Sequence, residues 1–91
     1  MFLLKRLFAL PPDTFELKQR HDVPGLIAAL GHRFPWIRRD AAQILGQMQE
    51  PQVRAPLTAA LNDRDSEVRH AVQDALDTLN APAPPPNSVA V

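Results

Sequence analysis

The chain lacks cysteine, and this absence excludes several kinds of chemistry at once. Without cysteine there are no disulfides, no thiolate nucleophiles and no sulfur ligands for a metal ion. A reducing compartment fits this composition, so we predict a cytoplasmic location, although an oxidising compartment stays open.

Net charge and long hydrophobic runs are lacking too. Ten basic residues balance ten acidic ones, so the whole chain offers no general electrostatic attraction for nucleic acid or for a membrane. No apolar run approaches the roughly 20 residues that a transmembrane helix needs. Lys5 and Arg6 interrupt the apolar residues at the start of the chain instead of preceding them, and no small-x-small cleavage site follows. We therefore do not expect a secretion signal.

The charges that are present are unevenly distributed. Residues 1–39 carry seven basic and three acidic residues, net +4, whereas residues 40–91 carry three and seven, net −4. Such polarity can steer a partner or favour head-to-tail self-association. A homodimer, in which the last helix pairs with its twin, stays open.

No catalytic or metal-binding arrangement is recognisable. The histidines, His21, His32 and His70, have no histidine or glutamate three or four residues further on, so we expect them to be exposed turn and helix residues. The serines and threonines fit helix caps and surfaces, and three scattered glycines cannot build a phosphate-binding loop. We predict that the chain is not an enzyme and binds no cofactor or metal.

An apolar stripe with helical period runs through residues 36–48 and returns 31 residues later. Its members are Ile37, Ala41, Ile44, Leu45 and Met48, and then Val68, Val72, Ala75, Leu76 and Leu79. Such a repeat predicts two helical hairpins that stack on each other, because neither can bury its apolar face alone.

Turn and cap residues predict the boundaries of the first helices. Asp13 precedes a short helix over residues 14–20, and Asp22 precedes one that Gly31 ends. Pro35 opens a helix that runs to about residue 48. We expect Phe15, Leu17 and Val23 to face inward in this first part, followed by Leu26, Ile27 and Leu30.

The same kinds of turn and cap residues predict the helices in the second half of the chain. Pro51 and Pro56 are too close for one helix through both, so the next helix should begin near Ala55, with Leu57 and Leu61 buried. Asp65 or Ser66 then caps a last helix that runs to about residue 80. Residues 81–91 are rich in proline and predict a disordered tail, which we expect to be passive, although a proline-recognising groove or a partner's sheet edge are alternatives.

The start of the chain allows two interpretations. Residues 2–10 predict a short amphipathic helix that Pro11-Pro12 ends. This helix either covers the apolar end of the stack, as terminal units of solenoids require, or anchors the chain to a membrane surface or a partner. Its two cationic residues are too few for strong membrane attachment.

The motifs resemble the HEAT-repeat family, and specifically the short HEAT-like repeats of phycobilisome lyases. The first unit carries Val23-Pro24-x-Leu26-Ile27-x-Ala29-Leu30 and Ile37-Arg38-x-x-Ala41-Ala42-x-x-Leu45-Gly46. The second carries Pro56-Leu57-x-x-Ala60-Leu61 and Val68-Arg69-x-x-Val72-x-x-x-Leu76. The resemblance covers residues 22–80. In the second unit Gln73 and Asp77 replace the usual alanine and glycine, which suits a unit that ends the stack.

The resemblance implies an all-α fold of armadillo type: a short right-handed α-solenoid of two HEAT-like hairpins with an N-terminal helical cap. The domains would be the capping helices (1–21), repeat 1 (22–48), repeat 2 (49–80) and the tail (81–91). The implied function is a non-catalytic scaffold or adaptor that binds another protein. Two alternatives are a lyase or lyase-accessory subunit of phycobiliprotein type and a membrane-peripheral protein anchored by residues 1–10.

Two arginines stand at equivalent places in the two units. Arg38 and Arg69 each follow the buried Ile or Val, and in HEAT-like units this arginine typically reaches an acid or a turn carbonyl of the adjacent layer. The alternative is a ladder of guanidinium groups that faces a ligand.

The stretch that departs most from the repeat is the candidate partner-binding site. Phe34 stands where the second unit has a capping acid, and Trp36 stands where it has a surface glutamate. The candidate contact residues are Arg33, Phe34, Trp36, Arg38 and Arg39, a composition typical of interface hot spots. Either the two aromatic side chains bind a partner, or they fold back to complete a thin core. Nucleic acid is a sub-case, since aromatics beside arginines can stack on bases, but a neutral chain of two units does not favour it.

Overall fold

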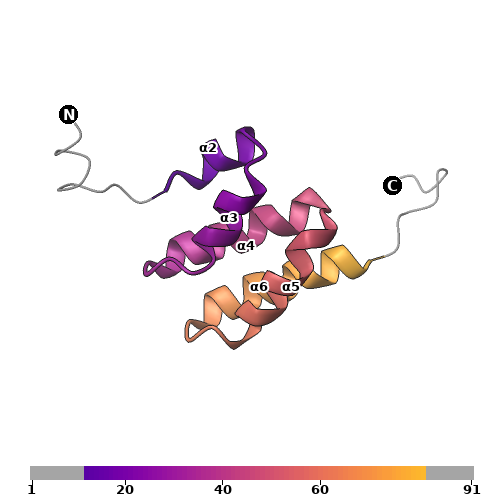
Figure 1. Ribbon diagram of the computed structural model, residues 1–91. Coiled ribbons are helices and arrows are strands. Elements are labelled where there is room, and N and C mark those ends of the chain that lie inside the picture. Colours follow the sequence, from indigo (N-terminus) through magenta and orange to yellow (C-terminus); the bar gives the residue numbers. More distant parts are fainter. Residues whose placement is uncertain (1–11, 82–91) are drawn as a thin grey trace, which may run out of the picture.

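The computed structural model describes residues 12–81, and in this part of the chain all the regular structure is helical (Figure 1). The elements follow in the order α2 (Thr14–Gln19), α3 (Val23–Ala29), α4 (Pro35–Met48), the 3-10 turn η1 (Pro51–Val53), α5 (Arg54–Ala59), the 3-10 turn η2 (Ala60–Asn62) and α6 (Ser66–Asn80). The predicted helix over residues 2–10 lies outside the described residues, and so does the predicted tail beyond Ala81.

Aspartates begin three of these helices, as the sequence predicts. Asp13 Oδ1 accepts the backbone N–H groups of Phe15 and Glu16 at 3.1 and 3.2 Å. Asp22 Oδ1 accepts that of Gly25 at 2.9 Å, and Asp65 caps α6 in the same way. Each carboxylate satisfies N–H groups that have no partner within the helix and favours the positive end of the helix dipole.

The helices form two hairpins in two layers. Helices α3 and α4 make the first hairpin, and α5 with α6 makes the second (Figure 1). Helices α4 and α6 run side by side in the same direction as the inner layer and share the most extensive contact between any two elements. The predicted fold class is therefore confirmed: the chain is a short helical solenoid of HEAT-like hairpins. The division at residues 22–48 and 49–80 stays a prediction.

The two inner helices approach closely because Gly46 has no side chain. A Cβ atom at this position would lie 2.7 Å from both Cα and Cβ of Ala75 on α6. Ala41 and Ala42 on the same helix also have small side chains, and both are fully buried. The core is completed by branched side chains such as Val72 on the facing helix.

The outer side of α6 carries polar residues at the positions where α4 has residues with small side chains. Gln73 and Asp77, which correspond to Ala42 and Gly46, are exposed, and Gln73 Nε2 donates to Asp77 Oδ1 at 3.0 Å. A further hairpin cannot pack there as α6 packs on α4, because it would bury polar groups that water now solvates. This agrees with a unit that ends the stack.

The expectation for Phe15 needs correction. Phe15 does not face inward: it is 64% exposed, whereas Leu17 packs against the core. Residues two positions apart in a helix point in directions about 200° apart around the helix axis. The side chains of Phe15 and Leu17 therefore cannot both face the same layer. In the second unit the chain forms the turn η1 at Pro51, and α5 then starts at Arg54, near Ala55 as predicted.

Candidate functional site

The first turn of α4 begins without a side-chain cap. Phe34 occupies the N-cap position and makes no capping hydrogen bond. Its backbone N–H instead donates to Nδ1 of His32 at 3.1 Å. The second hairpin has the corresponding contact from the N–H of Asp65 to Oδ1 of Asp63 at 2.9 Å. His32 thus takes the part in the turn that an aspartate takes in the next unit.

Aromatic and cationic side chains gather at this end of α4. The rings of Phe34 and Trp36 stack with their centroids 4.5 Å apart and their planes 9° apart. The guanidinium carbon of Arg33 lies 4.8 Å from the centre of the Phe34 ring, and the ring of His32 lies 5.1 Å from it. Phe34 packs partly against the core, whereas Trp36 is 51% exposed. We call Arg33, Phe34 and Trp36 the aromatic cluster.

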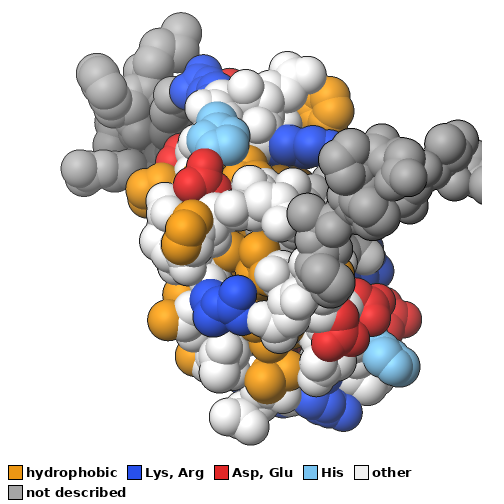
Figure 2. Space-filling view, turned by 90° about the vertical axis from the view of Figure 1, so that its right-hand side faces the viewer, with side chains coloured by type: hydrophobic (Ala, Val, Ile, Leu, Met, Phe, Trp, Pro, Cys, Tyr) orange, Lys and Arg blue, Asp and Glu red, His pale blue; other side chains and the backbone are white. Residues whose placement is uncertain are grey.

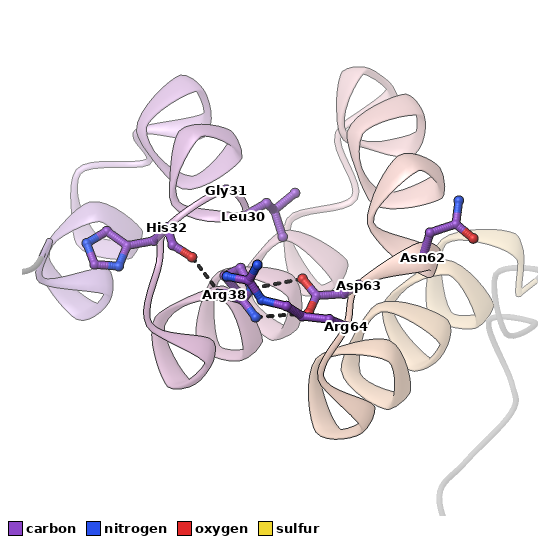
Figure 3. A pocket seen from close by; sticks show the side chains of 7 residues that line it. All are labelled: Leu30, Gly31, His32, Arg38, Asn62, Asp63 and Arg64. Atoms are coloured by element: carbon purple, nitrogen blue, oxygen red, sulfur yellow. Dashed lines mark hydrogen bonds and ion pairs between the residues drawn. The ribbon is translucent and has the colours of Figure 1, made fainter.

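Arg38 lies apart from this cluster, in the interior between the hairpins (Figure 3). Its Nε and Nη2 atoms donate to the two carboxylate oxygens of Asp63 at 2.8 and 3.0 Å. Its Nη1 atom donates to the backbone carbonyls of His32 and Arg33 at 2.7 and 3.0 Å. Only 4% of Arg38 is exposed. The arginine therefore joins the turn of the first hairpin to the turn of the second, as the resemblance implied.

The carboxyl group of Asp63 is held in its charged form. Burial alone would raise its pKa, but the hydrogen bonds from Arg38 and from the N–H of Asp65 outweigh this effect. The positive charges of Arg38 and Arg64 act in the same direction, so the pKa of Asp63 lies below its ordinary value.

This lowered pKa predicts a loss of stability in acid. The folded state binds fewer protons at Asp63 than the unfolded state, so the contribution is fully present above the unfolded pKa of about 3.8. It is lost as the pH falls through the lower, folded pKa. Denaturant unfolding between pH 6 and pH 2 should show a steeper decline below pH 4 in the natural chain than in an Asp63→Asn variant. Equal slopes would contradict this assignment.

Arg39 points toward the neighbouring inner helix. Its Nη1 atom lies 3.2 Å from Oε2 of Glu67 on α6, and its Nη2 atom lies 3.4 Å from Oδ1 of Asp40. The Arg39 side chain is 36% exposed, and such pairs at the surface contribute little to stability.

Of the five candidate residues, the structure brings three together, places Arg39 one helical turn beyond Trp36 and separates Arg38 from the others. Arg33, Phe34 and Trp36 form the aromatic cluster, Arg39 lies on the exposed side of the same helix, and Arg38 is internal. His32 was expected to be a surface residue, but it is half-buried and belongs to the turn that carries the cluster. The sequence signal for it was its alignment with Asp63 at the 31-residue offset.

Shallow hollows lie on other faces. One of about 390 Å³ between α3 and α5 is lined by mostly apolar residues that include Ile27, Leu30 and Pro56. One of about 280 Å³ between α4 and α6 is lined by Gln43, Gly46, Gln47, Ala71, Asp74, Ala75 and Thr78. Figure 2 shows the edge on the side of η1, where hydrophobic side chains appear in small groups between polar ones.

Residues 12–81 contain no group of three or more histidine, aspartate or glutamate side chains that could hold a metal ion. Of the helices in the same range, none combines the length and apolar character that crossing a membrane requires.

A family model described as HEAT repeats matches residues 23–86, well over half of the chain. No curated protein and no solved structure matches the chain significantly.

Proposed function

Since the chain belongs to the HEAT-repeat family, we propose that it is a non-catalytic module that binds another protein through the aromatic cluster and Arg39. HEAT repeats generally serve as protein-interaction scaffolds and are generally not enzymes. The surface we propose consists of Arg33, Phe34, Trp36 and Arg39. Arg38 is left out because its donors are used inside the fold.

The exposure of Trp36 carries this proposal. Half of an indole ring lies in water, at a position where the second unit has the exposed Glu67. The ring is held in place by its stack on Phe34, so it loses little conformational freedom on binding. Tryptophan and arginine are the residue types that most often dominate the binding energy of interfaces.

The aromatic cluster also replaces a helix cap. A side-chain cap of the kind Asp65 gives α6 stabilises a helix by about 1 kcal/mol, and α4 lacks it. With phenylalanine at this position the chain gains aromatic surface and gives up the stability of a helix cap. Such a loss of local stability is common at functional sites.

The finer resemblance to lyase-type repeats stays a prediction. Its motifs, such as Ile37-Arg38 and Leu45-Gly46, lie in the inner helices, where they build the contact between the hairpins. They therefore support the fold and not lyase chemistry. A membrane anchor over residues 1–10 falls outside the described residues.

We expect Trp36→Ala to spare the fold and remove partner binding. The side chain is half in water, so its loss should change the free energy of unfolding by no more than about 1 kcal/mol. The matched control is Gln52→Ala, at an exposed residue of η1 beyond the opposite end of α4. Thermal unfolding followed by circular dichroism measures stability, and affinity capture with the tagged chain measures binding.

Trp36→Ala should lose the proteins that the natural chain captures, whereas Gln52→Ala should keep them. A drop in melting temperature of more than about 10 °C for Trp36→Ala would mean that the indole belongs to the core. That outcome would contradict the proposed function.

A further inference from the structure

The repeat places equivalent arginines on the two inner helices, and both make the same contact with the preceding turn. Arg38 Nη1 donates to the carbonyl oxygen of His32 at 2.7 Å. Arg69 Nη1 donates to the carbonyl oxygen of Asp63 at 2.8 Å. The acceptor lies six residues before the arginine in both cases. One hydrogen bond of the same kind therefore anchors each guanidinium group to its turn.

The two arginines differ in what their remaining donors contact. The Nε and Nη2 atoms of Arg38 hold both oxygens of Asp63, an acid that the following hairpin supplies. In residues 12–81 no hairpin follows α6, and the hydrogen bond to the Asp63 carbonyl is the single one that the side chain of Arg69 donates in this range. Arg69 is exposed. It presents to solvent the planar pair of donors that suits a carboxylate.

We propose that Arg69 anchors a second contact surface, on the exposed side of α6, that takes an acidic turn of a different protein. The pair of Arg38 and Asp63 is the model for this contact. The partner's carboxylate accepts hydrogen bonds from Nε and Nη2 of Arg69, as the carboxylate of Asp63 does from Arg38. Asp63 lies two residues before the N-cap of α6, and its Oδ1 also accepts the N–H of Asp65 at 2.9 Å. A matching ligand is thus an aspartate that is fixed by the turn before a helix.

Within residues 12–81, a second copy of this chain offers no free acid at this position, two residues before the N-cap of a helix. Its Asp63 side chain is only 10% exposed and is paired with its own Arg38. The corresponding position in its first hairpin is His32, which carries no carboxylate. The charge complementarity therefore points to a partner other than the chain itself.

The rest of the α6 surface limits how this partner binds. Gln73 and Asp77 occupy the places where Ala42 and Gly46 admit a close neighbour on α4. A partner helix cannot come equally near, so the contact is centred on Arg69 and the partner's acidic turn. This face is distinct from the aromatic cluster, and the proposal goes beyond the proposed function.

The test is a titration of the isotope-labelled full chain, observed by NMR. The probe is an acetylated and amidated peptide that copies residues 62–72, the acidic turn and the start of α6. We expect saturable shifts of the Arg69 Nε–Hε signal and of the amides in the first two turns of α6. The same peptide with Asp63→Asn should bind at least about fivefold more weakly, because it removes the charged acceptor.

Two variants of the chain complete the test. Arg69→Lys keeps the charge but loses the planar pair of donors, and it should weaken binding about fivefold or more. Arg64→Lys, at an exposed arginine of the same turn, is the matched control and should leave the affinity unchanged. The proposal is overturned by an absence of saturable shifts, by shifts centred on the aromatic cluster, or by equal affinity of the two peptides. None of these results bears on the Trp36→Ala experiment.

Discussion

An Arg38→Ala variant is expected to lose about 3–5 kcal/mol of the free energy of unfolding, the cost of leaving a buried charge without its partner. The substitution strands the carboxylate of Asp63, whose side chain is 10% exposed, and two backbone carbonyls of the preceding turn. These groups would keep their desolvation cost and lose their hydrogen bonds. Chemical denaturation of the full chain measures the change.

The matched control for this experiment is Arg69→Ala. Arg69 has the same place in the repeat, but it is exposed and donates to one carbonyl. We expect it to cost no more than about 1 kcal/mol. If the two variants lost equal stability, the junction between the hairpins would not depend on the ion pair between Arg38 and Asp63.

Gly46→Leu is expected to be the second severe change, at about 2–3 kcal/mol. The first added atom alone would lie 2.7 Å from backbone and side-chain atoms of Ala75, so α4 and α6 must move apart. Overpacking of a filled core commonly costs about 1–3 kcal/mol, and a whole leucine at a backbone contact lies at the upper end. The better helix propensity of leucine offsets about 1 kcal/mol at most.

Asp77→Leu is the control, because residue 77 corresponds to residue 46 and is exposed. It should change the free energy of unfolding by no more than about 0.5 kcal/mol. Thermal unfolding of both variants is sufficient, since 1 kcal/mol shifts the melting temperature of a domain of this size by about 4–8 °C. Equal melting temperatures for the two variants would contradict the close packing of the inner helices.

The sequence predicted the fold well because its signals are local and repeated. Capping aspartates, prolines in first turns and the apolar stripe at a 31-residue offset each define a boundary or a face. Phe15 was misplaced because an apolar residue in a six-residue helix carries no periodicity that could assign its face.

The candidate site was less predictable, since it depends on which neighbours each side chain meets. Arg38 and Arg69 occupy equivalent positions, but one is buried and the other exposed, because only Arg38 has a described hairpin on its far side. The stack of Phe34 on Trp36 depends on ring orientations that spacing cannot give. The contact of His32 with the N–H of Phe34 required the comparison with Asp63.

The central claim is that Trp36 lies in a protein-binding surface, and photo-crosslinking tests it most directly. A photoreactive amino acid is placed at residue 36 of the full chain, and in a parallel sample at residue 52, an exposed position of η1 beyond the opposite end of α4. The chain is then irradiated in its own cells. We predict a discrete crosslinked protein for residue 36 that is absent for residue 52. The same products from both positions, or none from residue 36, would contradict the claim.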